Sequence, residues 1–203
     1  TYLSAASRGT PTPGGGSVAA LAGALGAAMA AMAANFTVGR KKFAAVEGEA
    51  REALAACVKT RDELLRLMDE DTRAYAEVSR AYGMPKETPE EKRARSAAIQ
   101  AALGAAMAAP LEVVRLCRGV MGPVARLGEI ANPNLISDVG VAAILAEAAL
   151  RAAKLNVEIN LKELKDAARA ASVRAEIAAA AQETTAAAAA VLERVNRAVG
   201  GGG

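Results

Sequence analysis

The sequence predicts an all-α bundle of about five to six mostly long antiparallel helices with no sheet. Hydrophobic residues make up 53% of the 203 positions but aromatic residues only 2%, and alanine is the commonest apolar type. Alanine has the highest helix propensity and a small side chain, so helices built from it can pack closely. No stretch has the sustained apolar–polar alternation of a strand. The length suits one domain, 1–203, and no internal repeat or linker divides it.

Composition excludes several classes of protein. With 25 basic and 22 acidic residues the net charge is only +3, and few aromatics are present to stack on bases, so we expect no nucleic-acid partner. Cys57 and Cys117 lack CxxC spacing, which argues against a disulfide framework or a zinc site and favours the cytoplasm. The absence of histidine excludes Ser-His and Cys-His nucleophile pairs.

One apolar stretch has three possible interpretations. No residue from Gly9 to Gly39 is charged, and Ser17–Val38 is long enough to span a bilayer. The apolar run after Arg8 also resembles a signal peptide. The run is rich in Ala, Gly and Met rather than Leu and Ile, and therefore favours a buried central helix over a membrane segment. Its small-residue faces also suit tight helix contact, including contact across a dimer.

The first elements follow from prolines and glycines. Residues 1–16 are expected to be extended or briefly helical and then to form a Pro/Gly loop. Ser17 is a suitable N-cap for a helix that runs to about Thr37, with Gly39 as its C-cap.

The second predicted helix, Phe43–Ala81, ends before Gly83 and Pro85. Its inner seam has heptad spacing. The seam residues are Cys57, Arg61, Leu64, Met68, Asp71, Tyr75, Val78 and Tyr82.

The next helix has a strong start signal. Thr88 is the N-cap, Pro89 takes the first helical position, and Glu91 completes a capping box. This helix is predicted to run to Ala108, and Pro110 either opens a new helix or kinks this one.

The stretch that follows, as far as Leu127, is expected to be broken near Gly119, Gly122 and Pro123. Residues 132–138 then form a polar connection.

A helix begins in that connection and is predicted to reach Leu155 or Leu161. A last helix covers Leu164–Val199, either separate from the preceding one or continuous with it. Residues 200–203 are expected to be a frayed tail.

Two features could bind an anion. Gly14, Gly15, Gly16 and Ser17 stand at a helix N-terminus, where backbone N–H groups and the helix dipole attract a carboxylate or phosphate; the alternative is a tight turn against a neighbouring helix. Lys42 belongs to a basic cluster at the far end of the same helix. It either captures an anionic substrate tail or stabilises the helix C-terminus.

Asp71 is the candidate acid/base group. A carboxylate on a packed seam is costly to ionise, so it must have a partner, face a cavity, or have a tuned pKa. The alternative is an ion pair with an arginine of another helix. Tyr75 lies one helical turn further along.

Two groups of polar residues could contact a ligand. Asn134, Ser137 and Asp138 belong to the 132–138 turn, which has more polar groups than capping requires. Asn156 and Asn160 lie one turn apart on one helix face and either project into a pocket or are surface amides.

These stretches together resemble the formiminotetrahydrofolate cyclodeaminase family. The matching segments are TPTPGGGSVAALAGALGAAMAAMAANFTVGRKKF (10–43), DTRAY (71–75), AYGMPK (81–86), NPNLISDVGVAA (132–143) and NVEINL (156–161). The resemblance implies an all-α homodimer with tetrahydrofolate bound near the subunit interface. The implied reaction releases ammonia from 5-formiminotetrahydrofolate and closes the 5,10-methenyl bridge. The enzymatic alternative is methenyltetrahydrofolate cyclohydrolase, which opens that bridge with water, and an alternative of another class is a non-catalytic folate-binding scaffold.

The resemblance also marks candidate site residues. Asp71 and Asp138 are the expected catalytic carboxylates. The expected folate-binding residues are Gly14, Gly15, Gly16, Ser17, Lys42, Tyr75, Lys86, Asn134, Ser137, Asn156 and Asn160. The chemistry needs only proton transfer and charge stabilisation, so we expect no metal and no cofactor beyond the folate substrate. Because the long apolar run favours a buried helix, we also expect no membrane partner.

Overall fold

The computed structural model describes residues 1–200, which are almost wholly helical and contain no strand. A one-turn helix, α1 (Tyr2–Ala6), precedes the long elements. The long helices are α2 (Gly15–Asn35), α3 (Glu47–Tyr82), α4 (Pro89–Ala106), α5 (Ala108–Ile130), α6 (Ile136–Glu163) and α7 (Ala167–Gly200), with short 3-10 turns η1 (Lys41–Val46) and η2 (Pro133–Leu135). The predicted all-α class is confirmed.

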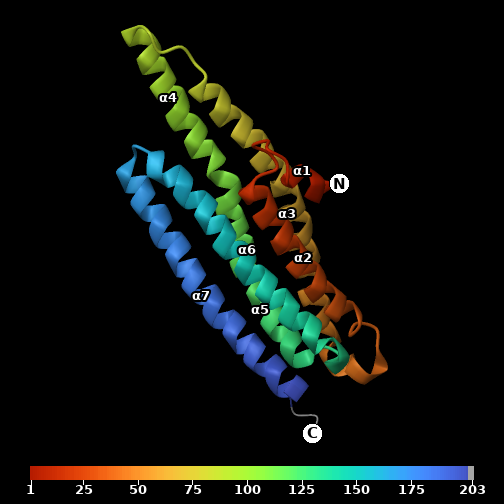
Figure 1. Ribbon diagram of the computed structural model, residues 1–203. Helices are drawn as coiled ribbons and strands as arrows, with labels where there is room; N and C mark the ends of the chain where they lie inside the picture. The colour runs from red at the N-terminus through yellow and green to blue at the C-terminus, as the bar shows by residue number, and fades with distance from the viewer. Residues whose placement is uncertain (201–203) are drawn as a thin grey trace.

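The long helices form an up-and-down bundle in which α4 and α5 follow one another as a single rod with a break at Met107 (Figure 1). The central helix is α2, which packs against α6, α3 and α5. The upper parts of α3 and α4 continue past the point where α2 begins (Figure 1).

Small residues allow α2 to lie close to its neighbours. A Cβ atom added at Gly26 would meet the Ala142 carbonyl oxygen of α6 at 3.0 Å, and one at Gly23 would meet Cys117 Sγ of α5 at 2.9 Å. More than half of the residues of α2 are buried. By length and apolar content alone Gly15–Asn35 and residues 89–130 resemble membrane spans, but α2 is mostly buried inside the bundle, as in the core helix of a soluble protein.

The helix boundaries confirm part of the prediction. The capping box is present, since Glu91 N donates to Thr88 Oγ1 at 3.2 Å and Thr88 N donates to Glu91 Oε2 at 3.0 Å. Pro110 lies in the first turn of a new helix, α5. Helices α6 and α7 are separate. Of the four residues predicted to form a frayed tail, Gly200 is the last residue of α7, and 201–203 lie outside the described residues.

Three predicted boundaries are wrong. Helix α5 continues through Pro123, because burial of neighbours such as Val124 outweighs the one hydrogen bond that proline removes. Ser17 is not an N-cap: α2 begins at Gly15 after Gly14, which has no capping side chain. Gly39 is not a C-cap, because α2 already ends at Asn35 and Gly39 forms the following turn with φ +72°.

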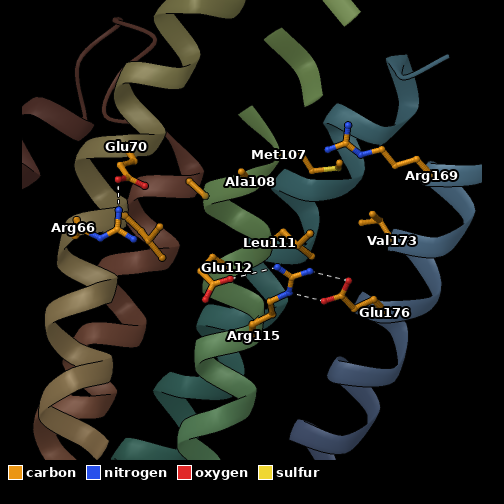
Figure 2. A pocket seen from close by; sticks show the side chains of 12 residues that line it. Arg66, Glu70, Met107, Ala108, Leu111, Glu112, Arg115, Arg169, Val173 and Glu176 are labelled. Carbon is orange, nitrogen blue, oxygen red and sulfur yellow. Dashed lines mark hydrogen bonds and ion pairs between the residues drawn. The ribbon is translucent and has the colours of Figure 1, made fainter. Parts of the chain in front are cut away.

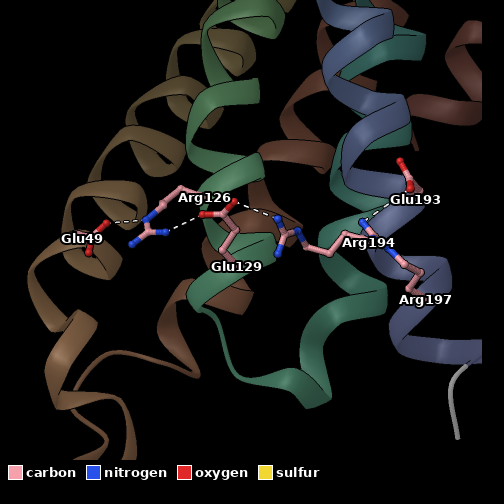
Figure 3. A network of polar contacts seen from close by, with 6 residues as sticks. All are labelled: Glu49, Arg126, Glu129, Glu193, Arg194 and Arg197. Atoms are coloured by element: carbon pink, nitrogen blue, oxygen red, sulfur yellow. Dashed lines mark hydrogen bonds and ion pairs between the residues drawn. The ribbon is translucent and has the colours of Figure 1, made fainter.

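At the lower end of the bundle a chain of ion pairs joins three helices (Figure 3). Arg126 of α5 pairs with Glu49 of α3 at 2.5 Å and with Glu129 at 2.6 Å, and Glu129 also pairs with Arg194 of α7 at 3.0 Å. All of these side chains are largely exposed to solvent, so each pair contributes little to the stability of the fold. The network connects α3, α5 and α7 at this end of the bundle.

The close contact between α2 and α6 can be tested by adding one methyl group. Gly26→Ala should lower the free energy of unfolding by about 1–3 kcal/mol, because backbone atoms of α6 must move. Gly119→Ala, on the open side of α5, has no atom within 4 Å of the new Cβ and should raise it by about 0.5–1 kcal/mol. Urea unfolding of both variants measures the difference, and equal effects would contradict the packing described.

Candidate functional site

A cavity of about 330 Å³ lies where the upper part of α3 extends past the start of α2. The α3 seam is packed at Leu64 but opens at Asp71, and the seam residues beyond it line the cavity. Its walls come from the N-terminal loop, α2, α3, α4 and α6. The lining residues are Pro11, Thr12, Gly14, Gly15, Gly16, Asp71, Tyr75, Val78, Tyr82, Leu103, Ala106, Asn156, Ile159, Asn160 and Glu163.

Asp71 caps α2 from a different helix. The backbone N–H of Ser17, in the first turn of α2, donates to Asp71 Oδ2 at 3.0 Å. That N–H has no partner within its own helix, and the N-cap, Gly14, has no side chain to accept from it. The Ser17 hydroxyl is within hydrogen-bond distance of the Tyr2 hydroxyl, at 2.9 Å, which ties α1 to the same point.

The adjacent glycines give the polar side chains room. A Cβ at Gly16 would overlap the Asp71 carboxylate, and one at Gly15 would lie 3.1 Å from Asn156 Oδ1. Among residues 1–200 the triple glycine therefore contacts the protein's own carboxylate. The carboxylate at this helix N-terminus belongs to the protein itself, whereas the sequence analysis expected the anion of a ligand there, and ligand binding by Gly14, Gly15 and Gly16 stays a prediction.

The surroundings of Asp71 shift its acidity. Burial raises the pKa of the carboxyl above its ordinary value, and the hydrogen bond from Ser17 N–H offsets part of that rise. The predicted alternative of an ion pair with an arginine is wrong within the described part of the chain, where Asp71 forms no ion pair. An unpaired, half-buried carboxylate at a cavity is suited to accept and return a proton.

Two amides of α6 lie across the cavity from α3. Asn156 Nδ2 donates to the Ala152 carbonyl at 2.9 Å, and Asn160 Nδ2 donates to the Asn156 carbonyl at 2.8 Å. These bonds orient both side chains and leave their Oδ1 atoms as acceptors. Tyr75, which is 45% exposed, adds an aromatic wall.

Other predicted site residues lie elsewhere in the same chain. Asn132 N donates to Thr37 Oγ1 at 2.9 Å, so the 132–138 turn lies beyond the C-terminal end of α2, whereas Asp71 lies at its N-terminal end. A helix of 21 residues is roughly 30 Å long at 1.5 Å per residue. Within one chain Asp71 and Asp138 therefore lie near opposite ends of α2 and do not line the same cavity. The residues at the far end are Lys42, Asn134, Ser137 and Asp138, while Lys86 lines a cavity next to that of Asp71.

Sequence reasoning missed several residues of the cavity. Val78 and Tyr82 were on the predicted seam but were not assigned to a site, although they continue the line from Asp71. Leu103 and Ala106 come from α4, and the sequence contains no signal that this helix packs there. Ile159 lies between the two asparagines and could have been found from their spacing.

A second cavity, of about 470 Å³, lies between α3, α5 and α7 and contains more charge (Figure 2). Its cations are largely neutralised: Arg115 pairs with Glu176 at 2.6 Å and with Glu112 at 3.4 Å, and Arg66 pairs with Glu70. We favour the Asp71 cavity as the candidate site, because it has an unpaired acid/base group.

Comparison with known proteins gives four findings. The model of the formiminotransferase-cyclodeaminase family matches residues 1–179. Methenyltetrahydrofolate cyclohydrolase from Methylorubrum extorquens is 44% identical over 168 residues, which are 83% of this chain and 81% of that protein. Formimidoyltransferase-cyclodeaminase from Sus scrofa is 35% identical over 195 residues, which are 96% of this chain but 36% of that protein. The crystal structure of formiminotetrahydrofolate cyclodeaminase from Thermotoga maritima matches 98% of this chain and 94% of that one, with a TM-score of 0.79 and 32% identity.

Replacing the half-buried charge should stabilise the fold. Because burial raises the pKa of Asp71, its ionised form destabilises the folded state at pH values above that raised pKa. Asp71→Asn keeps an acceptor for Ser17 N–H without the charge, and should unfold at higher urea concentration than wild type at neutral pH. The difference in urea midpoint between variant and wild type should shrink as the pH falls through the raised pKa of Asp71. Lower stability of the variant at neutral pH would show that the hydrogen bond to the carboxylate outweighs burial.

Proposed function

The chain belongs to the formiminotransferase-cyclodeaminase family, and we propose on that premise that it is a one-carbon folate enzyme that acts on the carbon held between N5 and N10 of tetrahydrofolate. The observation that carries the proposal is the half-buried Asp71 carboxylate, capped by Ser17 N–H and facing a cavity of about 330 Å³. Ligand cavities of roughly 300–1,000 Å³ are typical for small molecules.

Asp71 would move protons in either family reaction. In hydrolysis, water adds to the methenyl carbon and gives up a proton to the Asp71 carboxylate. The C–N5 bond then breaks, N5 receives that proton, and the hydroxyl proton leaves to solvent as the formyl C=O forms on N10. Burial raises the pKa of Asp71, which makes its carboxylate a stronger base in the first step, and the proton that it takes up lets it act as the acid in the next step.

In cyclodeamination the same carboxylate would again accept a proton first and then return it. N10 attacks the carbon of the formimino group, whose nitrogen is protonated, and the N10 proton passes to the Asp71 carboxylate. The amino group takes that proton from Asp71 and leaves as ammonia, which produces the methenyl cation. Both reactions pass through a tetrahedral carbon, and a fixed carboxylate beside it favours the cation.

The two asparagines would orient the pterin ring. Its amide and amino groups are hydrogen-bond donors, and the Oδ1 atoms of Asn156 and Asn160 are the acceptors that remain available. Tyr75 and Tyr82 offer aromatic surface for the planar parts of the substrate. No group in either reaction requires a metal or redox partner, so we propose that folate is the only small molecule needed.

Of the two activities we place cyclohydrolase first. The relative of this name is 44% identical and is covered over 81% of its length. The cyclodeaminase, which the sequence analysis placed first, is the second candidate, favoured by the match to the Thermotoga maritima structure over 94% of that chain. Assays of the purified protein with methenyltetrahydrofolate and with 5-formiminotetrahydrofolate distinguish the two activities. Faster loss of methenyl absorbance than in buffer supports hydrolase, and gain of methenyl absorbance from the formimino substrate supports deaminase.

Removing the carboxylate tests the proposed role of Asp71. Asp71→Asn should lower kcat roughly 10²-fold or more, the scale of a lost general acid/base. Asp69→Asn, an exposed carboxylate two residues away on α3, is the matched control and should retain wild-type kcat. Methenyl absorbance measures both. Wild-type kcat in Asp71→Asn would favour the non-catalytic scaffold instead.

We further propose that the chain forms a homodimer through an apolar face on α2 and α6. The exposed large apolar side chains of this face are Val18 and Leu25 of α2, Phe36 directly after it, and Val141, Ile144, Leu155 and Ile159 of α6. Leu155 is 71% exposed and Leu25 is 50% exposed, which is unusual for two adjacent helices of a soluble monomer. Such a protein, with two buried free cysteines, would suit the reducing cytoplasm.

The dimer would also account for the division of the candidate residues between two ends. The apolar face runs between the Asp71 cavity and the 132–138 turn. If a two-fold axis crosses the middle of this face and the paired helices are antiparallel, the turn of the second copy lies beside the cavity of the first. Asp138, Asn134 and Ser137 of the second copy would then complete a site near the subunit interface.

Charges placed on the apolar face should separate the subunits. Leu25→Glu/Ile144→Glu should halve the mass measured by light scattering, because both side chains would be desolvated at the interface. Leu65→Glu, which changes a similarly exposed residue on α3, should leave the mass unchanged. A monomeric wild type, or a double variant that keeps the wild-type mass, would contradict the proposed dimer.

A further inference from the structure

The first nine residues are held to the bundle chiefly by one side-chain contact. Helix α1 has no buried residue, and Leu3 is 75% exposed, so apolar burial holds this segment only weakly. Among the hydrogen bonds that residues 1–9 form within the described chain, only the bond between the Tyr2 and Ser17 hydroxyls, at 2.9 Å, reaches a later element. The position of α1 therefore depends on Tyr2.

Ser17 is the point at which three helices meet. It lies in the first turn of α2, its hydroxyl is bonded to Tyr2 of α1, and its backbone N–H donates to Asp71 Oδ2 of α3 at 3.0 Å. Only 1% of the residue is exposed, so water has little access to replace either partner. A change in the side-chain contact of Ser17 is therefore passed on to the N–H that Asp71 accepts.

The start of α2 has little stiffness of its own. Gly14, Gly15 and Gly16 precede Ser17, and glycine has more backbone freedom than any other residue. Gly14, the N-cap, has no side chain to bond to the first turn. Ser17 is thus the first residue of α2 whose side chain can fix this turn from outside, and Tyr2 is its partner.

The same contact fixes one wall of the Asp71 cavity. Pro11 and Thr12, which line the cavity, belong to the short connection between α1 and α2. Because α1 is tied to Ser17, both ends of this connection are anchored at the start of α2. A wall that is anchored beforehand lowers the entropic cost of binding a substrate against it.

We propose that Tyr2 is a positioning residue that acts through Ser17: it holds the Asp71 carboxylate and the Pro11–Thr12 wall in the arrangement that the substrate meets. The inference rests on the function proposed above for the Asp71 cavity. Tyr2 does not line that cavity, so it acts on the reaction through Asp71 and without touching the substrate.

Asp71 titrates among few other ionisable groups. The cavity is lined by three further titratable side chains, Tyr75 and Tyr82 of α3 and Glu163 of α6, while its walls from α2, α4 and the N-terminal loop contain none. Burial raises the pKa of Asp71, and the hydrogen bond from Ser17 N–H offsets part of that rise. Loosening the Ser17 turn should therefore raise the pKa of Asp71 further.

The pH profile of kcat tests the role of Tyr2. Tyr2→Phe removes one oxygen atom and should move the acidic limb of the folate reaction to higher pH by about 0.5–1 unit, because Asp71 must be ionised to accept the first proton. Ser17→Ala breaks the same bond but keeps the backbone N–H, so it should give the same shift, and the double variant should shift no further. Above the acidic limb kcat should stay close to wild type, since the carboxylate is still present.

Ser7→Ala is the matched control. It removes a hydroxyl that bonds only within the N-terminal segment, to the Ser4 carbonyl at 3.3 Å, and should leave the pH profile unchanged. A merely structural role for Tyr2 predicts a lower urea midpoint with an unmoved acidic limb. That result, or shifts of Tyr2→Phe and Ser17→Ala that add in the double variant, would overturn the assignment.

The positioning role and the folate function fail in different ways. Carbon-13 NMR of the Asp71 carboxyl measures its pKa in the protein without substrate, and so does not depend on turnover. If the folate function is wrong, wild type turns over neither folate, yet the Asp71 pKa still differs between wild type and Tyr2→Phe. If only the role of Tyr2 is wrong, wild type turns over folate, and the Asp71 pKa is the same in both proteins.

Discussion

The candidate site depends on one hydrogen bond between two helices, from Ser17 N–H at the start of α2 to the Asp71 carboxylate of α3. It provides the cap that Gly14 cannot supply, and it holds a carboxylate where α2 begins, at the point beyond which α2 no longer covers the α3 seam. Burial and the hydrogen bond shift the pKa of Asp71 in opposite directions, and burial has the larger effect. The interaction that orders the helix start thus also prepares a proton acceptor.

That hydrogen bond requires the small residues around it. Gly16 leaves space for the Asp71 carboxylate, and Gly23 and Gly26 let α2 lie within contact distance of α5 and α6. The same closeness fixes where α6 presents Asn156 relative to Asp71. A glycine-rich loop and an alanine-rich helix, which could be taken for a flexible turn and a membrane span, are here the parts that set the geometry of the site.

The sequence predicted the helical class, the capping box at Thr88 and the seam that leads to Asp71, because each depends on local propensity or on spacing within one helix. It did not predict that α5 continues through Pro123, since burial against other helices outweighs the local effect of proline. It grouped Asp71 with Asp138, because family motifs mark positions but not distances. The residues of α4 in the cavity had no local signal, since only the tertiary packing of α4 against α3 and α6 brings Leu103 to the site.

The most direct test of this account is a carbon-13 NMR titration of the Asp71 carboxyl, with Asp71→Asn used to assign the signal. The account predicts a pKa above the ordinary value of about 3.9 for an aspartate and a change in that titration when a reduced folate occupies the cavity. An ordinary pKa that does not respond to folate would contradict the claim that Asp71 is a half-buried acid/base group in the substrate site.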